Sequence, residues 1–115
     1  MRERSRDKGR LEDIVFYANN VKKILDGVSY DDFVNDIRIY YSVMKNIEII
    51  GEAANMLSKD FIETHTGLPW KQIIGMRHVL VHGYYTITPE KIWETVQEDL
   101  PVLKEQILEK ILQHE

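Results

Sequence analysis

Two apolar stripes run along residues 30–57, which read YDDFVNDIRIYYSVMKNIEIIGEAANML. Apolar residues that recur every three or four positions share one face of an α-helix, so this spacing predicts a single helix from about residue 30 to about residue 57. A surface helix of a monomer needs only one apolar face, so the second stripe predicts a central place in a bundle, a subunit interface, or both. Gly51 is small enough for a neighbouring backbone to approach closely. The stripes consist of Phe33, Ile37, Tyr40, Met44 and Ile47, and of Ile39, Val43, Ile50, Ala53 and Leu57.

The sequence before and after this stretch also has local structural signals. Residues 10–26 carry apolar side chains at steps of three and four, which predicts a helix that Gly27 ends. Ser29 precedes two acidic positions and places a capping hydroxyl at the positive end of the next helix. Residues 58–69 interrupt the period and predict a connection, with room for a short turn over residues 60–63.

Two more helices follow the connection. Residues 70–82 form the first, and Gly83 is placed to end it. The Thr-Pro pair at residues 88–89 supplies the N-cap and the first-turn residue of the last helix. Because Pro101 lacks a backbone donor, this helix is expected to kink or break near Asp99. Its core face is Ile92, Val96, Leu100, Leu103, Ile107 and Ile111.

Length indicates one domain over residues 1–115, and the helical spacing of its apolar residues predicts that it is all-α, an antiparallel bundle of four to five helices. A chain of 13.6 kDa is too short for a second core. It contains no cysteine, which excludes disulfides, thiolate nucleophiles and zinc sites with sulfur ligands. No apolar run is long enough to span a membrane, and the N-terminus lacks the apolar core of a signal peptide. We therefore expect a cytoplasmic protein.

Positive charge is concentrated at the N-terminus. The formal net charge is −4, yet the first ten residues hold five basic side chains against two acidic ones. The acidic remainder argues against a broad DNA-coating surface, because phosphate binding needs clustered Lys and Arg. We expect residues 1–9 to form a basic, flexible arm, which is either a solvated terminus or an aid to RNA binding.

Arg77 breaks the pattern of the helix predicted over residues 70–82. At about 100° per residue, its side chain falls inside the apolar arc of that helix. An arginine there needs an anion, carbonyl oxygens or a wet cleft, because burying its charge without a partner is expensive. One interpretation is an internal ion pair with Glu52. The other is a functional cleft.

His82 lies five residues after Arg77, which is about 140° around an ideal helix. The two side chains can share a site if the helix ends or unwinds at His82, and Gly83 favours such an ending. An arginine beside a histidine is a suitable pair for RNA cleavage. The histidine transfers protons at the 2′-hydroxyl or the leaving oxygen, and the arginine stabilises charge on the phosphorane.

A second pairing uses the same helix. His78 and His82 are four residues apart, the spacing at which two imidazoles can share a metal ion. No third ligand is evident, and the metalloprotease pattern is absent because no glutamate follows His78. We therefore predict no catalytic metal and no cofactor. A phosphate-binding glycine loop and a serine nucleophile elbow are absent as well.

Several ordered motifs occur along the chain: RLEDI at residues 10–14, IEIIGEAA at 47–54, LPWKQIIGMR at 68–77, VHGYY at 81–85, WE at 93–94 and EDLP at 98–101. Together they resemble the HepT-like proteins of the HEPN superfamily over most of the chain. The family pattern is an arginine, four to six residues, a histidine, any residue and a tyrosine. Arg77, His82 and Tyr84 match it.

The resemblance implies a HEPN-like homodimer whose paired motifs line an interface cleft and cut RNA without a metal. The RNA 2′-hydroxyl would be the nucleophile, Arg77 and His82 would be catalytic, and a cyclic phosphate would remain. The resemblance also implies a toxin–antitoxin pair in which a minimal nucleotidyltransferase attaches AMP to Tyr84. The added phosphate would then lie near Arg77 and compete with substrate.

His78 departs from the family pattern, because many relatives have asparagine directly after the arginine. It remains polar, so we predict His78 as an accessory residue that contacts phosphate or orients the backbone, and Glu52 as a second accessory residue. A non-catalytic nucleotide- or RNA-binding module that partners a nucleotidyltransferase is the alternative function. A third interpretation is a purely structural dimer in which Arg77 and Glu52 form an internal ion pair.

Overall fold

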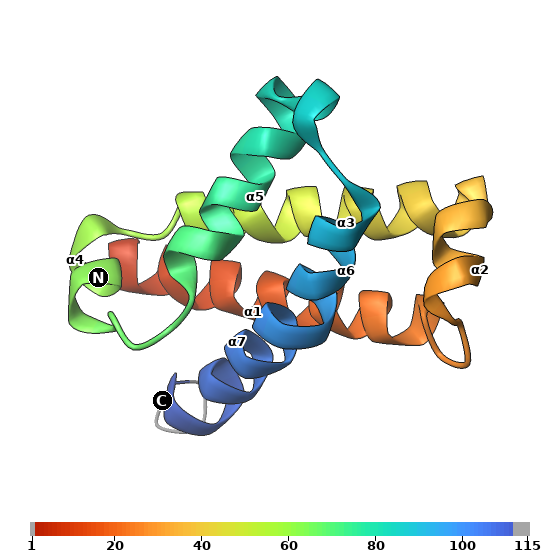
Figure 1. Cartoon of the computed structure of the whole chain (residues 1–115). Helices are drawn as coiled ribbons and strands as arrows, with labels where there is room; N and C mark the ends of the chain where they lie inside the picture. Colours follow the sequence, from red (N-terminus) through yellow and green to blue (C-terminus); the bar gives the residue numbers. More distant parts are fainter. Residues whose placement is uncertain (1, 112–115) are drawn as a thin grey trace.

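A computed structural model describes the backbone of residues 2–111 and the side chains of residues 6–109. Over these residues the chain is all-α, as predicted, and contains no strand. Figure 1 shows α1 and α3 running antiparallel, with α5 and the C-terminal helices crossing them. The elements are α1 (Arg2–Ile24), α2 (Tyr30–Asn35), α3 (Ile37–Asn55), α4 (Lys59–Thr64), α5 (Trp70–His82), η1 (Tyr84–Thr86), α6 (Pro89–Glu94), η2 (Thr95–Asp99), α7 (Leu100–Gln106) and η3 (Ile107–Ile111).

Helix α3 is the central helix of the bundle. It packs against both α1 and α5, so its two apolar stripes find partners within the chain. Ile47 from one stripe and Ile50 from the other are fully buried. Ile37 is the exception, since 68% of it is exposed. The central place predicted from the two stripes is confirmed, whereas the homodimer stays a prediction.

The single helix predicted over residues 30–57 is wrong at Asp36, where the chain divides into α2 and α3. Asp36 has an extended backbone, with φ −103° and ψ 105°, and its carboxylate accepts a hydrogen bond of 3.0 Å from the Arg38 backbone N–H. That N–H has no partner inside the new helix, so the aspartate caps it. The same hydrogen bond is the main reason why the pKa of Asp36 is lowered.

Helix α1 begins at Arg2, so the helix start predicted near residue 10 is wrong; residues 2–9 of the predicted basic arm are helical, and residue 1 lies outside the described residues. The buried Asp7 carboxylate accepts hydrogen bonds from the Ser58 backbone N–H at 2.9 Å and from its hydroxyl at 2.7 Å. Ser58 in turn caps α4, a helix that replaces the short turn expected in the connection. This contact ties the beginning of α1 to the beginning of α4.

Where a kink or break was predicted near Asp99, the structure has η2, a turn of π-helix that ends at Asp99. The Leu100 backbone N–H bonds to the Thr95 carbonyl, five residues back, and α7 then continues through Pro101. A wider turn accommodates a proline ring that would clash with the carbonyl four residues earlier. The predicted core residues of this helix from Ile92 to Ile107 are buried, while the side chain of Ile111 lies outside the described residues.

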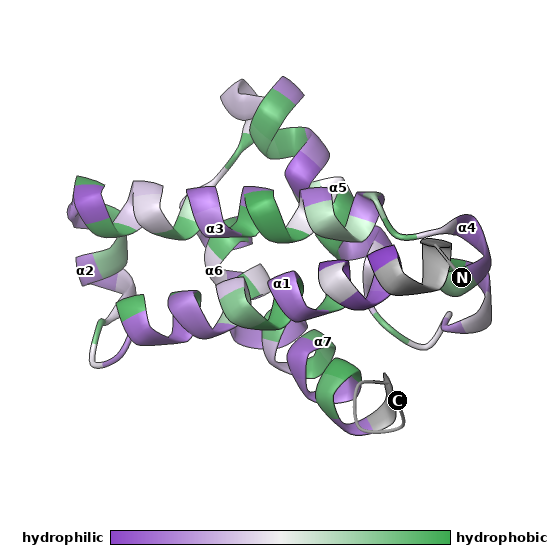
Figure 2. Ribbon diagram, turned by 180° about the vertical axis from the view of Figure 1, so that it is seen from behind, coloured by the Kyte–Doolittle hydropathy of each residue, from purple (hydrophilic) through white to green (hydrophobic). Residues whose placement is uncertain are grey.

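Hydrophilic and hydrophobic residues alternate along the helices, as Figure 2 shows for α1 and α7. This is the pattern expected for amphipathic helices that share one core. None of the helices in the described part of the chain is long and apolar enough to cross a membrane.

Candidate active site

The site begins where α5 crosses α3 at Gly51. A Cβ atom on Gly51 would overlap the Cβ of Arg77 and would lie 3.0 Å from the Ile73 carbonyl oxygen. Only a glycine therefore allows the α5 backbone to come this close to α3, as the sequence predicted. The close crossing lays the aliphatic part of Arg77 across α3 and fixes the direction of its guanidinium.

The guanidinium of Arg77 is paired with Glu52, as one interpretation of the sequence expected. Arg77 Nη2 lies 2.8 Å from Glu52 Oε2, and the two side chains are 26% and 47% exposed. The contact is close, but it is not directed as a hydrogen bond, and Arg77 Nε is buried with no hydrogen-bond partner among the described residues. A guanidinium has five donors, so donors remain for an anion. A pair this open to water contributes little to stability.

Arg77 and Glu52 open onto a groove of about 470 Å³ that lies over α1 and α3. The other charged residues of the groove were not predicted as site residues. Arg10 and Asp13 lie in the RLEDI motif, which was the available signal, but their closeness to Arg77 depends on the fold. The remaining lining residues are Arg10, Asp13, Lys45, Glu48, Ile49, Ala53 and Met56.

His82 is the last residue of α5, so the helix ends here as predicted, but it does not unwind before this residue. Gly83 caps the helix, and its backbone N–H donates a hydrogen bond of 2.8 Å to the Val79 carbonyl. An unbroken helix directs the Arg77 and His82 side chains about 140° apart. The fold of one chain therefore does not bring these two predicted catalytic residues together, and His82 is exposed to solvent.

Beyond Arg77, α5 and η1 project from the bundle as an exposed tip, visible at the top of Figure 1. We use the term tip for residues 78–86. The rings of His78 and His82 lie side by side, with centroids 5.0 Å apart. Tyr84 and Tyr85 are 73% and 79% exposed and form an edge-to-face pair. The phenol of Tyr84 is thus open to an enzyme that would modify it.

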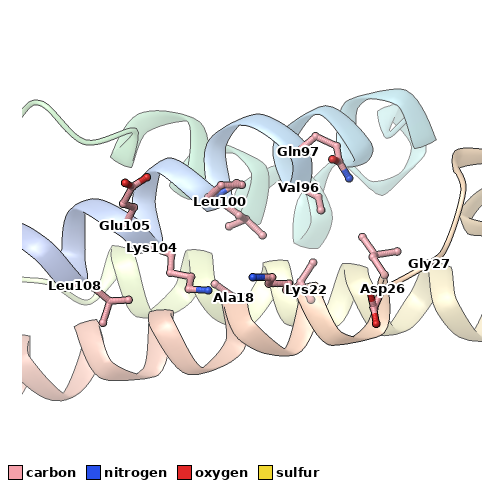
Figure 3. A pocket seen from close by; sticks show the side chains of 13 residues that line it. Ala18, Lys22, Asp26, Gly27, Val96, Gln97, Leu100, Lys104, Glu105 and Leu108 are labelled. Carbon is pink, nitrogen blue, oxygen red and sulfur yellow. The ribbon is translucent and has the colours of Figure 1, made fainter.

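A second hollow, of about 570 Å³, lies between α1 and the C-terminal helices. Figure 3 shows the Lys22 and Lys104 side chains pointing into it over apolar residues that include Leu100. It contains none of the residues predicted for the site. Elsewhere in the described part of the chain, no group of three or more His, Asp or Glu residues is arranged to hold a metal ion.

Comparison with known proteins identifies the family of the chain. The family described as "Ribonuclease HepT-like" matches residues 14–110. The chain belongs to the HepT-like ribonuclease family. The family resemblance drawn from the motifs is therefore confirmed, and the motif residues on α5 and η1 belong to a HepT-like domain.

Relatives of this HepT-like chain match it over most of its length. The Caldanaerobacter subterraneus subsp. tengcongensis protein "Putative RNase TTE0752" is 41% identical, covering 91% of this chain and 89% of the relative. The Methanocaldococcus jannaschii protein "Putative RNase MJ1380" is 37% identical, covering 87% and 92%. "Probable ribonuclease HepT" of Thermococcus cleftensis is 34% identical, covering 84% and 88%. No solved structure matches the chain.

Proposed function

We propose that this HepT-like protein is a metal-independent endoribonuclease of the cytoplasm and the toxin of a toxin–antitoxin pair. The observation that carries the proposal is Arg77, which lines an open groove and contacts Glu52 there through Nη2, one of its two terminal nitrogens. Phosphate is the ligand that such a guanidinium binds best. His82, exposed on the tip, is the general acid or base.

Cleavage would proceed through the RNA's own 2′-hydroxyl. His82 accepts the proton of this hydroxyl, its oxygen attacks the phosphorus, and the bond from phosphorus to the 5′-oxygen breaks. The leaving 5′-oxygen takes up a proton from water, and the protonated His82 returns its proton to solvent, so the products are a 2′,3′-cyclic phosphate and a 5′-hydroxyl. Arg77 stabilises the negative charge that develops on the phosphorane oxygens. General acid–base catalysis of this kind contributes about 10²- to 10⁴-fold to the rate.

We further propose that a homodimer completes the site. Because α5 keeps Arg77 and His82 on different sides, the groove of one chain needs a histidine from elsewhere. The tip of a second copy would supply it. Apolar side chains left exposed on α1, on α3 and at the C-cap of α3 are consistent with such an interface, and they are Phe16, Ile37, Tyr41 and Met56.

The proposed antitoxin is a minimal nucleotidyltransferase that attaches AMP to Tyr84. The phenol oxygen would attack the α-phosphate of ATP, and pyrophosphate would leave. The exposure of Tyr84 supports this step. Because Tyr85 has a similar exposure, Tyr84→Phe and Tyr85→Phe are a matched pair. Intact mass after coexpression with the nucleotidyltransferase should show an AMP increment that only Tyr84→Phe abolishes. Loss of the increment in Tyr85→Phe instead would contradict the assignment.

The activity is tested with RNA cleavage in EDTA by unmodified protein, His82→Ala, Arg77→Ala and Arg77→Lys. We expect cleavage by the parent, a loss of at least about 100-fold in His82→Ala and Arg77→Ala, and a smaller loss in Arg77→Lys, which keeps the charge but not the planar fork. Lys71→Ala removes an exposed charge from the same helix and controls for net charge. Circular dichroism confirms that each variant is folded.

The alternative function, a non-catalytic nucleotide- or RNA-binding module, makes the opposite prediction. It requires Arg77-dependent affinity for AMP or RNA and no cleavage at high protein concentration. Cleavage that EDTA abolishes, or that His82→Ala leaves unchanged, would contradict the proposed mechanism.

A further inference from the structure

We propose that His78 and His82 form a binding site for one late transition-metal ion, Cu²⁺, Ni²⁺ or Zn²⁺, which inhibits the protein. The two imidazoles lie on one face of the last turns of α5, and both are exposed to solvent. Neither makes a hydrogen bond or an ion pair with any described residue, so both rings are available to an external ligand.

The spacing of the rings fits chelation of a single ion. An imidazole nitrogen lies about 1.2 Å from the ring centroid and about 2.0–2.1 Å from a bound Zn²⁺, so each centroid would lie about 3.2 Å from the metal. For ligand angles between about 90° and 109°, the two centroids would then be about 4.5–5.2 Å apart. The observed separation of 5.0 Å falls within this range. The separation of the two rings therefore suits the binding of one ion by both imidazoles.

The position of the pair on α5 also favours a cation. His82 is in the last turn of the helix, where the exposed carbonyl oxygens carry partial negative charge. Two imidazole nitrogens with water in the remaining positions are ligands that Cu²⁺, Ni²⁺ and Zn²⁺ accept, and Cu²⁺ is expected to bind best. The absence of a third protein ligand among the described residues makes the site an open and exchangeable one.

The consequence for activity rests on the proposed function. A metal ion bound through His82 occupies a nitrogen lone pair, so the imidazole can no longer exchange the proton of the 2′-hydroxyl or of the leaving oxygen. The ion would thus act as an inhibitor at the catalytic histidine.

Metal binding is measured without RNA, which keeps its outcome separate from that of the proposed function. The full chain, purified without a histidine tag, is titrated with Cu²⁺ in a non-coordinating buffer and followed by electron paramagnetic resonance. We expect one ion per chain with two nitrogen ligands, and at least tenfold weaker binding in both His78→Asn and His82→Asn. His114→Asn removes an imidazole outside the pair and should bind as the parent does. Parental affinity in either pair variant, or an equal loss in His114→Asn, would overturn the site.

Inhibition is measured as the ratio of RNA cleavage rates with and without Zn²⁺. The parent should be inhibited at least tenfold, and His78→Asn should show a ratio near one at the same Zn²⁺ concentration. Equal inhibition of the two proteins would overturn the regulatory role, even if Cu²⁺ binding is confirmed. A parent that binds Cu²⁺ through both histidines but cleaves no RNA would instead overturn the proposed function.

Discussion

The two halves of α5 have opposite environments. Its first half, residues 70–76, is anchored by Trp70, Ile73 and Met76, which are buried against the bundle. The tip carries His78, His82 and the tyrosines in the open, with Leu80 as its buried contact. Arg77 lies at the boundary between them. The first half sets the direction of the helix, and the tip presents reactive groups that contribute little to stability.

The largest expected effect contrasts the two halves directly. Ile73→Ala removes a fully buried side chain and should destabilise the fold by about 2–5 kcal/mol. Val81→Ala makes the same kind of change on the tip, where 38% of the residue is exposed, and should cost less than about 1 kcal/mol. Urea denaturation of both variants measures the difference. Similar losses in the two variants would show that the tip is part of the core.

The next effect concerns the crossing that positions Arg77. Gly51→Ala should destabilise the protein by about 1–3 kcal/mol, because the new Cβ overlaps Arg77 and forces α5 away from α3. Gly75→Ala is the matched control, since a Cβ there meets no atom within 4 Å. It should stabilise the helix by up to about 1 kcal/mol. Thermal melting should therefore shift in opposite directions for the two variants, and a shift in the same direction would contradict this packing.

A smaller effect is expected for the ion pair. Glu52→Gln should lower RNA cleavage about tenfold, equivalent to about 1.4 kcal/mol, because the guanidinium loses the charge that holds it at the groove. The unfolding free energy should change by less than about 1 kcal/mol, since the pair is partly exposed. Glu63→Gln removes an exposed carboxylate paired with Lys59 and controls for charge. Unchanged cleavage in Glu52→Gln would leave Glu52 without a positioning role.

The smallest effect is a pH dependence at the start of α3. The folded state lowers the pKa of Asp36, chiefly through its hydrogen bond from the Arg38 backbone, so the ionised carboxylate stabilises the fold. This contribution is present above the usual aspartate value of about 3.9 and is lost as the pH falls through the lowered pKa. Relative to Asp36→Asn, the parent should therefore lose melting temperature between about pH 4 and pH 2. If the melting temperatures of the parent and Asp36→Asn changed equally with pH over this range, the stabilising role of the ionised Asp36 carboxylate would be contradicted.

The sequence was sufficient for features that depend on local spacing. The position of α5, the N-cap Thr88 with Pro89 at the start of α6, and the Arg77–Glu52 pair are all confirmed. The break at Asp36 was missed because the apolar spacing continues across it, although an aspartate is a frequent N-cap.

Other features depend on contacts that no local pattern contains. Asp7 and Ser58 are 51 positions apart. The local pattern of the N-terminal residues therefore gave no sign of the hydrogen bonds between them. The groove likewise forms only in the folded chain, because Arg10, Lys45 and Arg77, which line it together, come from three different helices. Gly83 ends α5 after His82 as predicted, but the helix stays regular up to His82 and therefore does not turn this side chain towards Arg77.

The chemical identity of the cleavage products tests the central claim most directly. Unmodified protein is incubated in EDTA with an RNA and with the same RNA carrying a single 2′-deoxy substitution at the cleaved position, and the product ends are identified by mass spectrometry. The account predicts 2′,3′-cyclic phosphate and 5′-hydroxyl ends from the RNA, no cleavage at the substituted position, and loss of both products in His82→Ala. Products with 5′-phosphate ends, or cleavage beside the 2′-deoxy nucleotide, would contradict it.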